Sequence, residues 1–136
     1  MTNPVFHWPI RIYYSDTDAG GVVYHANYLN FFEHARTEML RAAGHEQSHD
    51  GQASWMFVVS EMTLKFARPA KLNQQLTVVT EICTARGASL DFVQSLVDED
   101  NNLYCQANVQ VVCVDAQTFR PTRIPQPIKQ ELTRAH

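Results

Sequence analysis

Four alternating segments fill most of residues 55–115 and constrain the fold more than any other feature. They span residues 55–67, 75–85, 88–98 and 103–115, and in each of them apolar side chains recur at alternate positions. A period of two is typical of strands with one buried face. The joining segments are short, which favours antiparallel pairing of successive strands. The sequence therefore predicts an antiparallel sheet.

A further strand precedes these four. Residues 6–14 also alternate, and one face of this segment carries Trp8, Ile10, Ile12 and Tyr14. Proline has no N–H to donate to a neighbouring strand, so Pro9 predicts an edge position or a bulge. With this segment the expected sheet has five strands.

One long helix is expected between the first strand and the other four. Residues 24–43 place apolar side chains at helical spacing, on a stripe of Tyr28, Phe31, Phe32, Ala35, Met39 and Ala42. Glu33, Arg36, Thr37 and Arg41 fall largely off this stripe. One helix against five strands is an α+β layout. A single helix cannot cover such a sheet, so we expect a partner subunit.

Length and composition exclude several classes of protein. The 136 residues suit a single domain spanning 1–136. The net charge is -3 without a basic stripe, which argues against nucleic acid as a partner. No apolar run approaches the ~20 residues of a membrane helix, and no signal peptide is evident. The three cysteines form no CxxC pair, which is typical of a reducing compartment. We therefore expect a cytoplasmic protein.

The stretch YSDTDAGGVVYHANY, residues 14–28, carries the residues best suited to chemistry. Asp16 and Asp18 are candidate carboxylates beside two glycines that allow a tight turn. The helix start, at Val23 to His25, offers unpaired amides and the positive end of the helix dipole. Such amides can hold a developing oxyanion. The layout suits attack on a polarised carbonyl.

An ordinary turn is the other interpretation of this loop. Asp before Gly-Gly is common in turns, and Asp often caps a helix. From the loop alone, catalysis and a turn both stay open. Two acids two positions apart on an extended backbone point to opposite sides, so one of them faces a site. If Asp18 is the working acid, Asp16 has a structural role.

Other candidate groups are weaker. His25 could orient a substrate carbonyl or a water, act as a general acid, or be a hydrogen-bonded surface residue. With Asp18 and His34 it makes only a weak metal pattern, because His34 lies off its face, and we expect no metal. Cys105 and Cys113 share the parity of apolar strand positions and are interpreted as buried small hydrophobes. No Gly-x-Ser-x-Gly elbow is present, which disfavours a serine hydrolase.

Basic residues occur in two turns. Arg86 and Ser89, in the turn RGAS, could bind a phosphate through guanidinium, amides and hydroxyl, or could simply form a hairpin turn. Arg68 and Lys71 could serve a similar role or keep a sheet edge soluble.

The segment YSDTDAGGVVYHANYLNFFEHARTEMLR, residues 14–41, resembles the signature of the hotdog-fold acyl-CoA thioesterases of the 4-hydroxybenzoyl-CoA thioesterase type. It is most similar to the Tol-Pal-associated acyl-CoA thioesterases of Gram-negative bacteria. The similarity covers essentially the whole chain, including MTLKFARPAKL, RGASL and VQVVCVD. The resemblance implies a hotdog, a long central helix wrapped by a five-stranded antiparallel sheet. It also implies homodimers or homotetramers with the pocket at a subunit interface.

Catalytic roles follow from this resemblance. Asp18 takes the position of the family's active-site acid. The backbone N–H near His25 would polarise the thioester carbonyl, and the His25 side chain would assist. Tyr14 matches a position near the site. Substrate binding would fall on Val23 and Tyr24 at the helix start.

The resemblance also implies contacts with CoA. Arg86 and Ser89 lie in the RGASL turn, which matches a region that meets the CoA arm in relatives. Asn73 departs from the family pattern, where an acid is frequent. Asn73 is expected in a turn, so the departure bears on local CoA contacts rather than on the chemistry.

The implied activity is hydrolysis of acyl-CoA to free acid and CoA, with Asp18 as general base or nucleophile. CoA is part of the substrate, so no cofactor is expected. The alternative is a non-catalytic module that binds acyl thioesters or acyl carrier protein in the cell-envelope or phospholipid machinery. A hotdog dehydratase acting on a β-hydroxyacyl thioester is a third, less favoured hypothesis. The resemblance also allows a peripheral position at the inner membrane, and the acyl group stays open.

Overall fold

The computed structural model describes residues 3–45 and 54–134. Five strands form one sheet in the order β1-β3-β4-β5-β2, and all four pairings are antiparallel. In chain order the strands are β1 (Val5–Arg11), β2 (Trp55–Phe66), β3 (Gln75–Ala85), β4 (Ser89–Val97) and β5 (Leu103–Asp115). The predicted α+β architecture is confirmed, and the strand bounds lie close to the predicted ones.

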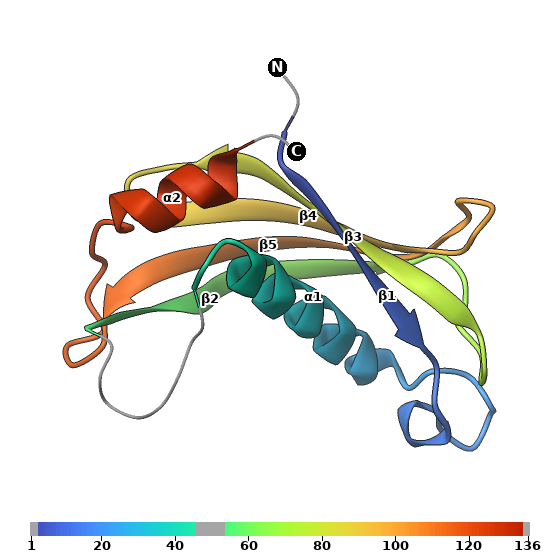
Figure 1. Ribbon diagram of the computed structural model, residues 1–136. Coiled ribbons are helices and arrows are strands. Elements are labelled where there is room, and N and C mark those ends of the chain that lie inside the picture. The colour runs from blue at the N-terminus through green and yellow to red at the C-terminus, as the bar shows by residue number, and fades with distance from the viewer. Residues whose placement is uncertain (1–2, 46–53, 135–136) are drawn as a thin grey trace.

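The long helix α1 (Tyr28–Ala42) lies along one face of the curved sheet (Figure 1). It is preceded by the short 3₁₀ helix η2 (His25–Asn27), so the predicted helix begins as a 3₁₀ turn. Phe32 and Ala35 are fully buried between α1 and the strands, together with Leu76, Val78, Leu90 and Leu96 of the sheet. Gly44 ends the helix with φ +93°, as expected of a C-terminal cap.

Arg36 is buried, although it was expected on the polar face of α1. Its exposed fraction is 7%, although helical spacing placed it largely off the apolar stripe. Ala42, expected on the stripe, is exposed. The buried face of α1 is therefore rotated towards Arg36 and Leu40, because the curved sheet contacts the helix over a wider arc than one stripe.

The first strand ends earlier than its alternation predicts. β1 stops at Arg11, and Tyr14 lies in the 3₁₀ turn η1 (Tyr14–Asp16) with 81% of its surface exposed. Tyr14 therefore does not share a face with Trp8 and Ile10. Pro9 lies in β1, the edge strand beside β3, which confirms the edge position.

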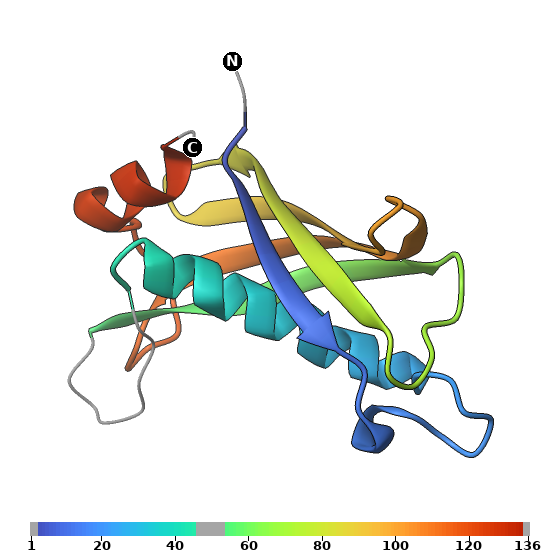
Figure 2. The same ribbon diagram turned by 45° about the vertical axis from the view of Figure 1, so that its right-hand side comes forward.

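The second helix, α2 (Gln126–Thr133), packs beside the C-terminal end of α1. No helix within residues 3–45 and 54–134 covers the opposite face of the sheet (Figure 2). The other edge strand, β2, pairs with β5 and exposes Val59 and Phe66. No helix in the described part of the chain is long and apolar enough to cross a membrane.

Candidate active site

The loop between β1 and α1 is held against the start of β3. Ile12 is fully buried, its N–H donates to the Gln74 carbonyl at 2.9 Å, and its carbonyl accepts from the Asn73 N–H at 2.9 Å. Asn73 has φ +72°, which confirms the expected turn. Residues 17–23 then form a small hairpin, in which Gly21 has φ +77°. These contacts fix the loop next to the helix start.

Asp16 has both carboxylate oxygens occupied. Oδ2 accepts from the Tyr13 N–H at 2.8 Å, and Oδ1 accepts from Asn27 Nδ2 at 2.7 Å. The Asp16 carbonyl also accepts from the Tyr24 N–H at 3.0 Å. Asp16 therefore ties the η1 turn to the helix start, which is a structural role.

Asp18 is exposed and keeps hydrogen-bonding capacity. Its Oδ1 accepts from the Gly20 N–H at 2.9 Å, and its backbone N–H donates to the Val22 carbonyl at 3.0 Å. Within the described residues, Oδ2 has no hydrogen-bond partner. A carboxylate oriented through one oxygen leaves the other available to a water or a substrate carbon.

The amides at the helix start divide into bonded and unbonded groups. The Val23 N–H donates to the Ala70 carbonyl at 2.8 Å, and the Tyr24 N–H donates to Asp16. In the described part of the chain, no carbonyl or side chain accepts from the N–H of His25 or Ala26. First-turn amides of a helix lack intrahelical partners and sit at its positive end. The candidate oxyanion donors are therefore His25 and Ala26.

A surface pocket adjoins these amides. It has a volume of about 300 Å³ and is lined by Val23, His25, Tyr28, Phe66, Ala67, Arg68 and Pro69. The Tyr28 hydroxyl accepts from the Ala70 N–H at 3.1 Å, and burial raises the pKa of this phenol. The Arg68 guanidinium lies over the Tyr104 ring at 5.6 Å. The pocket thus brings a cation to the helix start, a placement that the sequence left open.

The remaining predicted residues lie elsewhere in the chain. Arg86 and Ser89 form the β3–β4 turn, at the opposite end of β3 from the loop. The 11 residues of β3 span roughly 33 Å at strand spacing. Arg86 also pairs with Asp91 at 2.7 Å. Within one chain, this turn therefore lies far from Asp18.

Alternative chemistries find little support in the geometry. Asp18, His25 and His34 do not form a group that could hold a metal ion, and the described residues contain no other such group. Cys105 and Cys113 are fully buried, as expected, and burial raises the pKa of each thiol to about 11. Thiols of this kind are poor nucleophiles at neutral pH.

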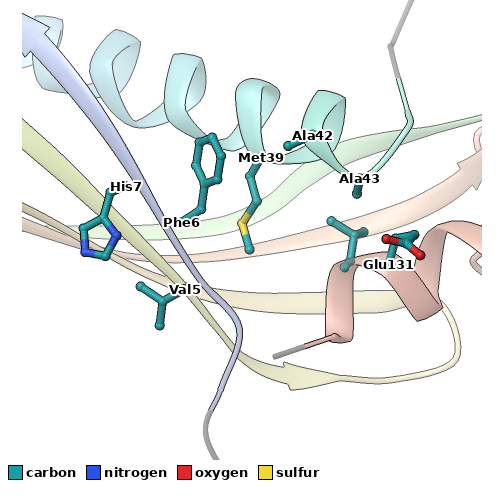
Figure 3. A pocket seen from close by; sticks show the side chains of 8 residues that line it. Val5, Phe6, His7, Met39, Ala42, Ala43 and Glu131 are labelled. Carbon is teal, nitrogen blue, oxygen red and sulfur yellow. The ribbon is translucent and has the colours of Figure 1, made fainter. Parts of the chain in front are cut away.

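Another cavity, of about 300 Å³, lies between β1, α1 and α2 (Figure 3). Phe6 and His7 of β1, Met39 of α1 and Glu131 of α2 are among its lining residues. It lies beside the C-terminal end of α1, away from the loop, and contains none of the predicted site residues.

Comparison with known proteins identifies the family. The profile of the thioesterase-like superfamily matches residues 13–132, which include the loop, the whole of α1 and most of the sheet. The chain belongs to the thioesterase-like superfamily. The resemblance seen in residues 14–41 is thereby confirmed at the level of the family.

Two similar proteins have thioesterase names. The acyl-CoA thioester hydrolase YbgC of Escherichia coli O6:H1 is 47% identical over 131 residues, covering 96% of this chain and 98% of the relative. The acyl-CoA thioesterase YbgC of Haemophilus influenzae is 42% identical over 130 residues, covering 95% of each.

Solved structures share the fold. A probable thioesterase from Bartonella henselae has a TM-score of 0.81 at 34% identity, covering 89% of this chain and 99% of that one. The protein SAV2348 from Staphylococcus aureus, solved in complex with CoA, has a TM-score of 0.88 at 17% identity, covering 97% and 84%. The second likeness concerns the fold alone. The expected hotdog fold is confirmed.

Proposed function

We propose that this protein hydrolyses acyl-CoA to a free acid and CoA, with Asp18 as the catalytic carboxylate. The observation that carries the proposal is the contrast between two acids in one loop. Asp16 has both oxygens bonded, whereas Asp18 keeps one oxygen unbonded in the loop that leads to a helix start with unpaired amides. The 47% identity to an acyl-CoA thioester hydrolase over most of both chains supports the substrate class.

The proposed reaction draws on the chain's own groups and water. The N–H of His25 would hydrogen-bond the thioester oxygen and stabilise the oxyanion as it forms. Asp18 would remove a proton from the attacking water, or attack the carbonyl carbon to form an anhydride that water then cleaves. In both routes the C–S bond breaks and the CoA thiolate leaves. The proton lost by the water passes to the thiolate or to solvent, and the Asp18 carboxylate is regenerated. No cofactor is needed, because CoA is part of the substrate.

A second copy of the chain is part of this proposal. Arg86 and Ser89 lie at the far end of β3, so they would reach the CoA arm of a site only in another subunit. The β2 edge, with Val59 and Phe66 exposed, offers strand hydrogen-bonding groups and apolar surface for a homodimer or homotetramer. Light scattering on a sizing column measures the assembly.

The test is CoA release from a panel of short, long and aromatic acyl-CoAs, followed with a thiol reagent. We expect the wild type to release CoA and Asp18→Asn to be slower by ~10²–10⁴. Asparagine keeps the oxygen that accepts from the Gly20 N–H, so the variant should fold normally by circular dichroism. Because Cys83 is exposed, an enzyme-only blank removes its contribution to the signal.

Two results of this panel would contradict the proposal. A folded Asp18→Asn variant with wild-type turnover would exclude Asp18 as the catalytic acid. No release from any acyl-CoA would favour the non-catalytic binding module. Association with the Tol-Pal system, use of acyl carrier protein, and a position in the cytoplasm or at the inner membrane stay predictions from the resemblance.

A further inference from the structure

Three polar side chains lie buried between α1 and the sheet, outside the proposed catalytic loop. They are Arg36 of α1, Thr80 of β3 and Gln94 of β4, with exposed fractions of 7%, 0% and 0%. Arg36 Nη1 donates to Gln94 Oε1 at 2.9 Å. Gln94 Nε2 donates to Thr80 Oγ1 at 3.0 Å and to the Phe32 carbonyl at 2.9 Å. The amide of Gln94 therefore holds the guanidinium in place without neutralising it.

Within the part of the chain that the structure describes, the charge of Arg36 has no close counterion. Among the described residues, no carboxylate lies within ion-pair distance of its guanidinium. Burial lowers the pKa of Arg36, and the Glu33 carboxylate raises it by a smaller amount. A buried cation without an anion costs several kcal/mol. Of the five N–H donors that a guanidinium carries, the hydrogen bond to Gln94 uses one. The site therefore suits an incoming anion.

A cavity of about 210 Å³ gives access to this cation. Its wall consists of Glu33, Arg36, Thr37 and Leu40 of α1 together with Phe57, Val58, Val59, Phe92 and Val111 of the sheet. Glu33 lies at the rim, because 57% of its side chain is exposed. The sheet side of the wall is apolar and α1 contributes one buried cation, which suits a ligand that has an apolar stem and an anionic end.

The place of the cavity along α1 connects it with the proposed reaction. Arg36 lies eight residues after Tyr28, or about 12 Å along the helix axis. The Cα–Cβ bonds of a helix tilt towards its N-terminus, which is the end that follows the turn carrying His25. The volume is below the roughly 300–1,000 Å³ of pockets for drug-sized ligands, which favours a short acyl group.

We propose, given the acyl-CoA thioesterase function above, that this cavity takes a short acyl group ending in a carboxylate, which pairs with Arg36. The substrate class is thus the CoA thioesters of short dicarboxylic acids. Arg36 is a specificity-determining residue, and Gln94 positions it.

Adipoyl-CoA and hexanoyl-CoA test this proposal, because their acyl chains have the same length and differ in the terminal carboxylate. We expect the wild type to favour adipoyl-CoA in kcat/KM by about tenfold to a hundredfold, the usual worth of a hydrogen bond to a charged group. Arg36→Met should abolish this preference by lowering kcat/KM for adipoyl-CoA to the level of hexanoyl-CoA. Arg41→Met removes an exposed cation from the same helix and should change neither rate.

The outcomes separate this proposal from the thioesterase function. If the wild type hydrolyses hexanoyl-CoA and adipoyl-CoA with equal kcat/KM, Arg36 does not select the acyl group, although the thioesterase function stands. A carboxylate of a second copy of the chain bound to Arg36 would give that result. An equal loss of both activities in Arg36→Met would make Arg36 structural and overturn the proposal. Absence of CoA release from the whole panel would overturn both proposals.

Folding of the variant is checked separately. Methionine is apolar and unbranched like the stem of arginine, and it removes the cost of burying the charge, but it leaves Gln94 Oε1 without its donor. If Arg36→Met fails to fold, the wild-type preference and Arg36→Lys decide the matter. Arg36→Lys keeps the charge and should keep part of the preference for adipoyl-CoA. A folded Arg36→Lys variant with no preference, or a wild type with none, would overturn the proposal.

Discussion

The loop before α1 and the buried polar layer beneath α1 differ in how fully their polar groups are hydrogen-bonded. This layer consists of Arg36, Thr80 and Gln94. In the loop, the exposed Asp18 carboxylate and the His25 amide have unused hydrogen-bonding capacity. In the layer, Thr80 and Gln94 are bonded to protein partners, as buried polar groups usually are. The difference shows where water and substrate can take part. Within this layer the charge of Arg36 is the exception, because it has no counterion among the described residues. We therefore propose that it pairs with a carboxylate of the substrate.

After Asp18→Asn, removing one N–H from the loop should have the largest effect on turnover. His25→Pro deletes the proposed oxyanion donor at a first helical position, where proline is tolerated. Tyr24, with φ -60° and ψ 131°, already has the extended backbone that a residue before proline needs. We expect kcat to fall by ~10²–10³.

The matched control for this change is His25→Ala, which removes the side chain and keeps the N–H. Steady-state kinetics on the best acyl-CoA of the panel measures both variants, after circular dichroism has checked their fold. Equal rates for the proline and alanine variants would assign no role to the amide.

Thiol labelling should show that the buried core excludes reagents which reach the exposed side of the sheet. Cys83 is exposed, whereas Cys105 and Cys113 are buried with pKa values of about 11, against an ordinary 9.0. Their thiolate fraction at pH 8 is therefore lower by about 100-fold than that of an ordinary thiol. Mass spectrometry of the native protein should find the label on Cys83, and on all three thiols after unfolding. Rapid native labelling of Cys105 would contradict the burial.

The same two thiols make stability depend on pH. Their pKa values are raised in the folded state, so between pH 9 and about 11 the folded protein binds more protons than the unfolded chain. Their contribution is fully present below pH 9 and is lost as the pH rises to about 11. The free energy of unfolding by urea should fall across this window, and Cys105→Ala with Cys113→Ala should make the fall shallower.

Replacing the structural carboxylate of the loop should lower the stability of the fold, whereas replacing the proposed catalytic one should not. Asp16→Ala removes the acceptor of the Tyr13 N–H and of Asn27 Nδ2, which should lower the free energy of unfolding by about 1–3 kcal/mol. Asp18→Asn should leave that free energy unchanged. Urea titrations of both variants measure the contrast. Equal stabilities would remove the distinction drawn between the two acids.

Local periodicity predicted the scaffold well. The bounds of β3 and β5 coincide with the predicted segments, because alternation and turn residues act over a few positions. The same reasoning misplaced Arg36 and Tyr14. A helical pattern does not show how wide an arc the sheet will cover, and an alternating pattern continues past the point where pairing stops.

The candidate site was predictable only in part. The loop and Asp18 stood out through their residue types and their resemblance to a family. Gln94 gave a weak signal, as a polar residue on the apolar face of β4 with Leu90 and Phe92. Arg36 gave none, because a lone arginine in an amphipathic helix is normally exposed.

By itself the sequence determined one antiparallel sheet, one long helix and a reactive loop between the first strand and that helix. These features depend on neighbouring residues, whose spacing can be read directly. Only the tertiary structure decided that Asp16 is bonded while Asp18 is open, that Arg36 is buried, and that Arg86 lies at the far end of β3. Each of these depends on contacts or distances between segments far apart in the chain, which local spacing does not encode.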